Sequence, residues 1–216
     1  IDSESTDNTV KIASNYTDKI IQSPGKSFSQ KREIALNHST NDWILFLDAD
    51  ERMSNDLQQE IVSLVPQTGV NGYRINRRNY YFGKWVKHSG IYPDKQLRLF
   101  NKNFSEVIHR NVHEGINTSG IVMDLNGSIK HYSITDLNQM LSKINTYSTL
   151  EAQDKFIAEK QISRIGVFTH AVSSFIRVYI SRKGFLDGIE GLYVAFSYSI
   201  VNFLSHLKLL KLQGKL

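Results

Sequence analysis

The chain has 216 residues, enough for one core of ordinary size with an appendage. It contains no cysteine, which excludes disulfides and thiolate metal sites, so any metal must be held by oxygen or imidazole ligands. The net charge is +5, but residues 155–216 carry nine Lys or Arg against three Asp or Glu, so the basic character belongs to the C-terminal part. No nucleic-acid-binding motif accompanies this charge, and we expect no nucleic-acid partner.

The N-terminal part of the chain predicts helices that alternate with strands. A short helix follows Ser5, residues 19–21 predict a brief strand, and residues 27–37 predict a second helix. The apolar run at residues 43–47 is typical of a strand buried on both faces of a parallel sheet, and Ser54 is the N-cap of the helix that follows. This order predicts an α/β fold.

The apolar run ends in three carboxylates within four positions, Asp48, Asp50 and Glu51. Like charges this close repel each other unless a cation or solvent relieves them. If the stretch stays extended, Asp48 and Asp50 point the same way while Ala49 points away. Mg²⁺ and Mn²⁺ prefer carboxylate oxygens and are commonly completed by phosphates, so the motif suits a nucleoside diphosphate. The alternative is a solvated strand end whose acids favour the next helix N-terminus.

Residues 72–100 are rich in aromatic and basic side chains, which suit the faces of sugar rings and the phosphates of an anionic acceptor. These side chains are Tyr73, Arg74, Arg77, Arg78, Tyr80, Tyr81, Phe82, Trp85, His88 and Tyr92. The alternative is a β-hairpin with one packed face. Gly83 and Gly90 predict a mobile loop over the bound donor.

The C-terminal part predicts helices only. Thr135 and Asp136 precede a long helix, and two apolar stretches follow at residues 165–176 and 191–207. The first stretch is too short to span a bilayer and the second is marginal, so we expect an interfacial helical hairpin with lysines near the lipid headgroups. The alternative is a helical subdomain packed on the core or on a second copy.

Several segments resemble, in order, the motifs of family 2 glycosyltransferases. DSESTDNTV, FSQKREIAL and WILFLDADE resemble that family's "VDDGSTDNT" segment, its "ARNxG" helix and its metal-binding D-x-D strand. YFGKWVKHSGIYPDKQLRLFNK, NVHEGI and LNGSIKHYS resemble the bacterial subgroup that builds lipopolysaccharide core or related envelope glycans. Two departures are that Glu33 follows Arg32 where the family usually has Asn, and that the first strand with its "P-x-Y-N-E"-like loop is missing.

The resemblance implies a GT-A fold, a Rossmann-like mixed sheet flanked by helices. Residues 1–134 would form the catalytic domain without its first strand, and residues 135–216 a helical extension that associates with the membrane. The implied activity is inverting, metal-dependent transfer of a sugar, expected to be a hexose, from a UDP-sugar to a lipid-linked or lipopolysaccharide-type acceptor. Its expected place is the inner face of the cytoplasmic membrane.

The resemblance also assigns roles to individual residues. Asp2 corresponds to the nucleobase contact, Arg32 and Arg98 to contacts of the nucleotide and its phosphates, and Asp48 to ribose and metal. Asp50 corresponds to the direct ligand of Mn²⁺ or Mg²⁺, and His131 to the histidine that approaches the metal or diphosphate.

The general base implied by the resemblance is Glu114, next to His113, with Asp94 as the second candidate. A carboxylate in reach of the acceptor hydroxyl can take its proton as the new bond forms. The alternatives are that Glu114 pairs with Arg110 at helical spacing, and that Asp94 forms an ion pair with Arg98.

Two other functions stay open. Because the chain begins after the family's first strand, it could be a non-catalytic, membrane-associated remnant. The D-x-D motif also occurs in haloacid dehalogenase-type phosphotransferases, which need Thr or Val two residues after the second Asp, where this chain has Arg52.

Overall fold

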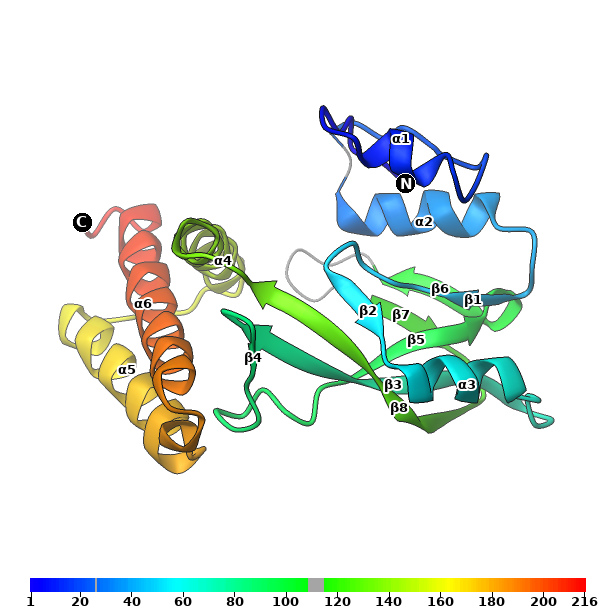
Figure 1. Ribbon diagram of the computed structural model, residues 1–216. Helices are drawn as coiled ribbons and strands as arrows, with labels where there is room; N and C mark the ends of the chain where they lie inside the picture. Colours follow the sequence, from blue (N-terminus) through cyan, green and yellow to red (C-terminus); the bar gives the residue numbers. More distant parts are fainter. Residues whose placement is uncertain (26, 109–114) are drawn as a thin grey trace. The chain divides into compact units, whose positions relative to one another are not determined.

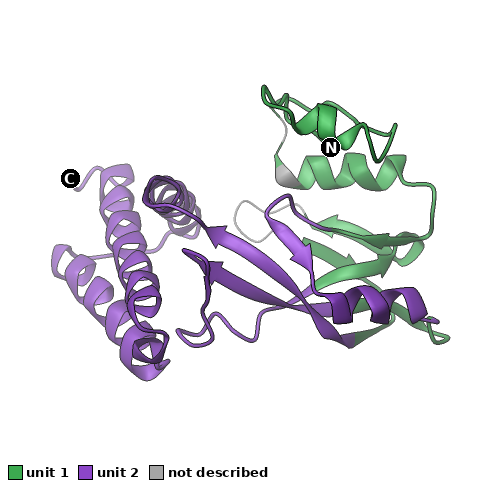
Figure 2. Cartoon of the chain, in the orientation of Figure 1, with its two compact units in different colours: residues 1–46, 66–73, 97–123 green, residues 47–65, 74–96, 124–216 purple. Residues whose placement is uncertain are grey.

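The computed structural model describes residues 1–25, 27–108 and 115–216 (Figure 1). The chain forms two compact units, each built from segments that are far apart in the sequence (Figure 2). Unit 1 contains residues 1–46, 66–73 and 97–123, and unit 2 contains residues 47–65, 74–96 and 124–216. The predicted α/β class is confirmed, since strands and helices alternate along the first half of the chain.

The main sheet has the hydrogen-bonded strand order β1-β5-β3-β8-β2, and β4 pairs with β3. Its strands are β1 (Trp43–Leu45), β2 (Glu51–Met53), β3 (Val70–Tyr81), β4 (Lys84–Trp85), β5 (Lys95–Asn101) and β8 (Ile121–Ile134). A separate ribbon pairs β6 (Ser105–Ile108) with β7 (Gly115–Thr118) in antiparallel register, and the 3₁₀ helix η1 (Lys102–Phe104) precedes it.

Unit 1 begins with α1 (Thr9–Ala13) and α2 (Phe28–His38). The predicted second helix is confirmed, and Ser27 forms a capping box with Gln30 at its start. The predicted strand at residues 19–21 is wrong. In its place the backbone makes one isolated parallel bridge between Asp2 and Gln22, in which the Asp2 N–H donates to the carbonyl of Ile21. A single bridge of this kind is too short to form a strand.

The strand predicted at residues 43–47 differs from the expectation. β1 is shorter, it is half-buried, and it pairs antiparallel with β5, with Trp43 opposite Asn101. Leu47 is 42% exposed, because the chain turns directly after it. An apolar run indicates that a segment contacts the core. It does not indicate whether the strand runs parallel or antiparallel to its neighbour, which depends on the strand it pairs with.

In unit 2, α3 (Asn55–Ser63) follows β2, and the Ser54 hydroxyl accepts a hydrogen bond from Leu57 N–H as predicted for an N-cap. Leu57 is fully buried. A Cβ atom on Gly127 would lie 2.4 Å from the Leu57 Cα, so the absent side chain of this glycine allows α3 to pack directly on β8. β2 pairs antiparallel with β8, so β2 and α3 both lie against this strand.

The C-terminal helices of unit 2 agree with the predicted segments. They are α4 (Leu137–Ile157), α5 (Arg164–Ile176) and α6 (Ile189–Leu212), with the π-helical turn η2 (Arg177–Ser181) and the 3₁₀ turn η3 (Gly184–Asp187) between the last two. The Asp136 carboxylate caps α4 by accepting from Gln139 N–H. Within the described ranges, none of the helices has both the length and the apolar character that crossing a membrane would require.

These helices pack onto the loop that follows the β3–β4 hairpin. A buried cluster joins Val86 of this loop to Val178, Val194 and Ala195. The buried Asp187 carboxylate accepts the N–H groups of Lys87 and His88, at 3.1 and 2.8 Å. The loop at Gly90, expected to be mobile, is therefore anchored on the helices, and a Cβ on Gly90 would collide with the Arg182 side chain.

Candidate active site

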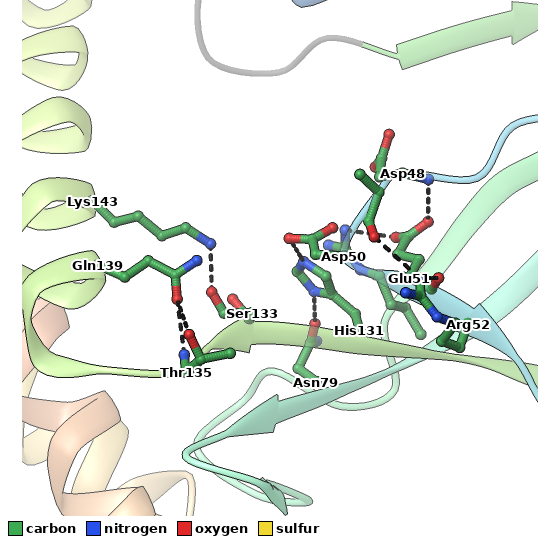
Figure 3. A network of polar contacts seen from close by, with 12 residues as sticks. Asp48, Asp50, Glu51, Arg52, Asn79, His131, Ser133, Thr135, Gln139 and Lys143 are labelled. Carbon is green, nitrogen blue, oxygen red and sulfur yellow. Dashed lines mark hydrogen bonds and ion pairs between the residues drawn. The ribbon is translucent and has the colours of Figure 1, made fainter. Parts of the chain in front are cut away.

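The acidic motif forms a tight turn between β1 and β2. The Glu51 N–H donates to the Asp48 carbonyl at 3.0 Å, and the Asp48 N–H donates to the Glu51 carboxylate at 3.1 Å. The extended arrangement expected for Asp48 and Asp50 is therefore wrong, because these two hydrogen bonds close the backbone into a turn. In Figure 3 the Asp50 carboxylate points toward His131, whereas the Asp48 side chain points away from that pair.

Asp50 and His131 come together because β2 pairs with β8. The register places Glu51 opposite His131, and the Tyr132 N–H donates to the Asp50 carbonyl at 2.9 Å. The Nε2 atom of His131 lies 3.2 Å from Oδ2 of Asp50. This contact with His131 holds the pKa of Asp50 below its usual value, although partial burial acts in the opposite direction.

Asn79 of β3 fixes the orientation of the His131 ring. Its side-chain N–H₂ donates to the Ile91 carbonyl and to Asp94, so its oxygen is the atom that meets Nδ1 of His131, at 2.6 Å. An amide oxygen can only accept, so Nδ1 donates to Asn79 and Nε2 is the ring nitrogen that faces Asp50. Asn79 is 6% exposed, which makes this hydrogen bond inaccessible to competing water.

Asp94 is held by three donors. Arg77 Nε and Asn79 Nδ2 donate to its Oδ2 at 2.8 and 3.0 Å, and Gln96 Nε2 donates to Oδ1 at 2.6 Å. Burial raises the pKa of Asp94, but Arg77, Asn79 and Gln96 together outweigh it, so the pKa lies below its usual value. Asp94 thus pairs with Arg77 rather than with the Arg98 considered from the sequence.

Glu51 completes the network on its buried side. Its side chain is fully buried and lies 3.5 Å from Nη1 of Arg77. An unpaired carboxylate at this position would be strongly destabilising, so Arg77 serves both Glu51 and Asp94. The polar network (Asp50, His131, Asn79, Asp94, Arg77 and Glu51) is therefore continuous, and all its members belong to unit 2.

Sequence reasoning missed two residues of this region. No sequence motif pointed to Asn79. It lies two positions from Arg77 on β3, so the two side chains are on the same face of the strand. Lys143 lies on α4, donates to the Ser133 carbonyl at 2.5 Å and points toward Asp50 in Figure 3. Burial lowers the pKa of Lys143 and the Asp50 charge opposes this, so the ammonium group and this carboxylate attract each other. No sequence signal placed α4 beside the motif.

The chemistry of the Asp50–His131 pair fits a divalent cation. A carboxylate oxygen and an imidazole nitrogen suit Mg²⁺ or Mn²⁺, and histidines that bind metals commonly donate their other ring N–H to a fixed acceptor, as His131 does to Asn79. Among the described residues, no group of three or more Asp, Glu or His side chains forms a complete metal cage. Substrate phosphates would therefore have to supply further ligands.

Three further expected site residues, Asp2, Arg32 and Arg98, belong to unit 1. The Asp2 carboxylate accepts from the N–H and hydroxyl of Ser5 at 2.9 and 2.5 Å, and these hydrogen bonds lower its pKa. Lys31, beside Arg32 on α2, donates to Ser3 at 2.6 Å, so the segments of Asp2 and Arg32 adjoin. Arg98 of β5 is 5% exposed. Glu114, the expected base, lies outside the described residues.

Comparison with known proteins assigns the chain to a family. Residues 1–123 match the family model of glycosyl transferase family 2. Proteins of Rickettsia typhi and Rickettsia prowazekii, each named an uncharacterized glycosyltransferase, are 30% identical over 227 residues, which is 100% of this chain and 78% of theirs. The lipopolysaccharide core biosynthesis glycosyltransferase LpsC of Rhizobium meliloti is 25% identical over 217 residues, 97% of this chain and 80% of its own. The sheet flanked by helices agrees with the expected GT-A fold, and the chain belongs to glycosyl transferase family 2.

Proposed function

We propose that the chain transfers a hexose from a UDP-linked donor, with inversion, to a lipid-linked or lipopolysaccharide-core acceptor at the inner face of the cytoplasmic membrane. The observation that carries this proposal is the Asp50–His131 pair, oriented by buried Asn79 at the end of the D-A-D turn. Family membership sets aside the phosphotransferase alternative for the same motif. The resemblance to LpsC, named for lipopolysaccharide core biosynthesis, supports the acceptor class.

In this proposal the polar network holds the donor diphosphate through Mn²⁺ or Mg²⁺. Asp50 and His131 would hold the ion, and the family resemblance assigns Asp2, Arg32 and Arg98 to the nucleotide and its phosphates. Asp48, expected to face both ribose and metal, would here face the ribose alone, because its side chain points away from the Asp50–His131 pair in Figure 3. The bound cation would offset the negative charge that grows on the leaving diphosphate.

Lys143 is proposed to add a second positive charge near the leaving group. Its ammonium group lies on the Asp50 side of α4 and is half-buried, where a charge acts more strongly than in bulk water. When the diphosphate departs, Lys143 can attract its oxygens without a change of fold. This gives the first helix of the C-terminal part a role in the reaction.

The acceptor hydroxyl needs a base, and we assign this role to Glu114. As the new C–O bond forms at the anomeric carbon, the hydroxyl proton passes to the carboxylate and the sugar–diphosphate bond breaks. Asp94 is the weaker candidate, because three donors hold its oxygens and its pKa is lowered, which reduces its tendency to take a proton.

Calorimetry of UDP binding tests the proposal. Wild-type protein should bind UDP with Mn²⁺ and much more weakly with EDTA, and Asp50→Asn should lower the affinity with Mn²⁺ by about 10- to 150-fold, as expected for a lost charged contact. The matched control is Asp124→Asn, because Asp124 pairs only with exposed Arg74 and Lys95 in the described contacts of β8. Equal UDP affinity with Mn²⁺ and with EDTA would contradict the metal role.

A further inference from the structure

The outer face of α5 is apolar and exposed. Five side chains at helical spacing form one stripe along α5 and the turn η2, and each is at least half exposed. They are Ile165 (76%), Phe168 (62%), Val172 (59%), Ile176 (50%) and Ile180 (55%). The opposite face of the helix is also apolar, with Val167, Ala171 and Val178 buried. A helix that is apolar on both faces normally has a partner on both.

The exposed surface continues onto α6. Phe168 and Phe203 form a ring pair with centroids 5.4 Å apart, and Phe175 pairs with Phe196 at 5.1 Å. Phe196 is 51% exposed and Ile200 is 39% exposed, so the second helix extends the stripe sideways. We call the five exposed side chains of α5 and η2, together with Phe196 and Ile200 of α6, the apolar face. Contiguous exposed apolar patches of this kind mark interaction sites rather than ordinary surface.

The charges around the apolar face have one sign. Between residues 160 and 186 the chain contains no Asp or Glu, whereas Arg164, Arg177, Arg182 and Lys183 all lie in this segment. The acids that follow are already engaged, since Asp187 is buried against His88 and Glu190 pairs with Lys84 at 2.9 Å. From residue 191 to 216 there are no further acids. The segments that carry the apolar face are therefore cationic.

We propose that the apolar face lies in the interface of an anionic lipid bilayer, parallel to the membrane plane. Apolar side chains flanked by Arg and Lys, on helices too short or too polar to cross, are the properties of interfacial helices. A second copy of the chain fits less well, because two such faces would bring cations against cations. The inference deepens the proposed function, on which it rests for the location of the acceptor.

Sedimentation with lipid vesicles tests this inference in the absence of any sugar nucleotide. The whole chain should bind phosphatidylglycerol-containing vesicles and bind pure phosphatidylcholine vesicles much less. The variant Ile165→Ser/Phe168→Ser/Ile176→Ser should lose binding at least about tenfold, and Arg177→Gln/Lys183→Gln should lose about tenfold on anionic vesicles only. The matched control is Val62→Ser/Val65→Ser, because these residues are 89% and 83% exposed near the end of α3.

Folding and oligomeric state separate the possible results. Each variant is first compared with wild type by urea unfolding. Because the substituted positions are exposed, the midpoint urea concentration should not change. Equal vesicle binding by the folded triple variant would overturn the inference, as would a wild-type dimer in light scattering that the triple variant abolishes while neither binds vesicles. A failure of vesicle binding with sugar transfer to a soluble acceptor intact would reject the membrane face and the membrane location, and would leave the proposed sugar transfer standing.

Discussion

The polar network of the strand ends and the apolar face of α5 and α6 depart from ordinary protein structure in opposite ways. In the network, charged side chains are partly or fully buried, and Glu51 is fully inaccessible. In the apolar face, large hydrocarbon side chains are exposed, and Ile165 is 76% accessible. Buried polar groups and exposed apolar patches are the observations that carry functional information, because ordinary folding disfavours both.

The two regions also differ in how their contacts are satisfied. Each member of the network contacts at least one other member, so its cost of burial is compensated within the chain. The apolar face is not covered by the described residues, and we propose a lipid surface as its partner. We infer that the network positions a bound ligand, whereas the apolar face determines where the protein is located.

The largest expected effect tests whether proton transfer belongs to Asp94 of the network or to Glu114. Glu114→Gln keeps the size of the side chain but removes its basicity, so transfer should fall by about 10²–10⁴-fold while UDP-sugar binding persists. The measurement is product formation beside donor affinity. Asp94→Asn is the comparison variant, and if it abolishes transfer while Glu114→Gln stays within a few fold, the base belongs to the network.

The second effect concerns the orientation of His131. Asn79→Ala removes the acceptor for Nδ1–H, so the Mn²⁺ concentration that half-saturates UDP binding should rise by about 10- to 100-fold. Asn71→Ala is the matched control, because Asn71 lies on the same strand and its amide donates to the Ser119 carbonyl in unit 1. An unchanged Mn²⁺ requirement in a folded Asn79→Ala protein would mean that the ring needs no such support.

The third effect asks whether the C-terminal helices contribute to the chemistry as well as to location. Lys143→Gln should lower the turnover rate by about tenfold through the loss of one charged contact, and Lys143→Arg should restore part of it. Lys155→Gln on the same helix is the control, because Lys155 contacts Glu151 and Ser205 instead. Equal turnover of the Lys143→Gln and wild-type proteins would restrict α4 to a structural role.

The smallest effect concerns a buried titratable group among the helices. Burial, with Lys155 nearby, lowers the pKa of His206 to about 4, and the side chain is 8% exposed. The unfolded chain binds this proton more readily, so His206 costs stability progressively as the pH falls from about 6.5 to 4. His206→Gln should reduce the loss of unfolding free energy between pH 7 and pH 4.5 by roughly 1–3 kcal/mol.

Urea unfolding at the two pH values measures this difference. His38→Gln is the control, because His38 is exposed at the end of α2. An identical pH dependence in the wild-type and His206→Gln proteins would show that His206 protonates as easily in the folded chain as in the unfolded one.

Local signals in the sequence predicted the helices and their starts well. Ser54 and Asp136 each cap the helix that was predicted after them, because capping depends on contacts within three or four residues. Ser27, predicted as the first residue of its helix, is the N-cap, and α1 begins after Asn8 rather than directly after Ser5. The family motifs led to a glycosyltransferase, which the family match confirms. The roles of all the site residues stay predictions, as does the division at residues 134 and 135. These residues are Asp2, Arg32, Asp48, Asp50, Asp94, Arg98, Glu114 and His131.

The pairing and the local conformation around the acidic motif were not predicted correctly from the sequence. The apolar run at residues 43–47 could not reveal that β1 pairs antiparallel with β5. The D-A-D spacing could not reveal that Asp48 and Asp50 lie in a turn, because the closing contact comes from Glu51, which Arg77 of β3 holds. The first expectation was wrong because a local pattern does not encode pairing across the sheet. The second was wrong because the Glu51 side chain accepts from the Asp48 N–H and closes the turn, which the spacing of the two aspartates does not indicate.

The sequence alone determined the α/β class, the helix starts, the family and the position of the acidic motif, since these follow from local spacing, capping and ordered motifs. Only the tertiary structure decided that His131 meets Asp50, that Asn79 orients the ring, that Lys143 of α4 faces the same carboxylate, and that one face of α5 stays exposed. The physical reason is that these contacts join residues up to about ninety positions apart. Strand register and helix packing, which depend on the whole chain, set them.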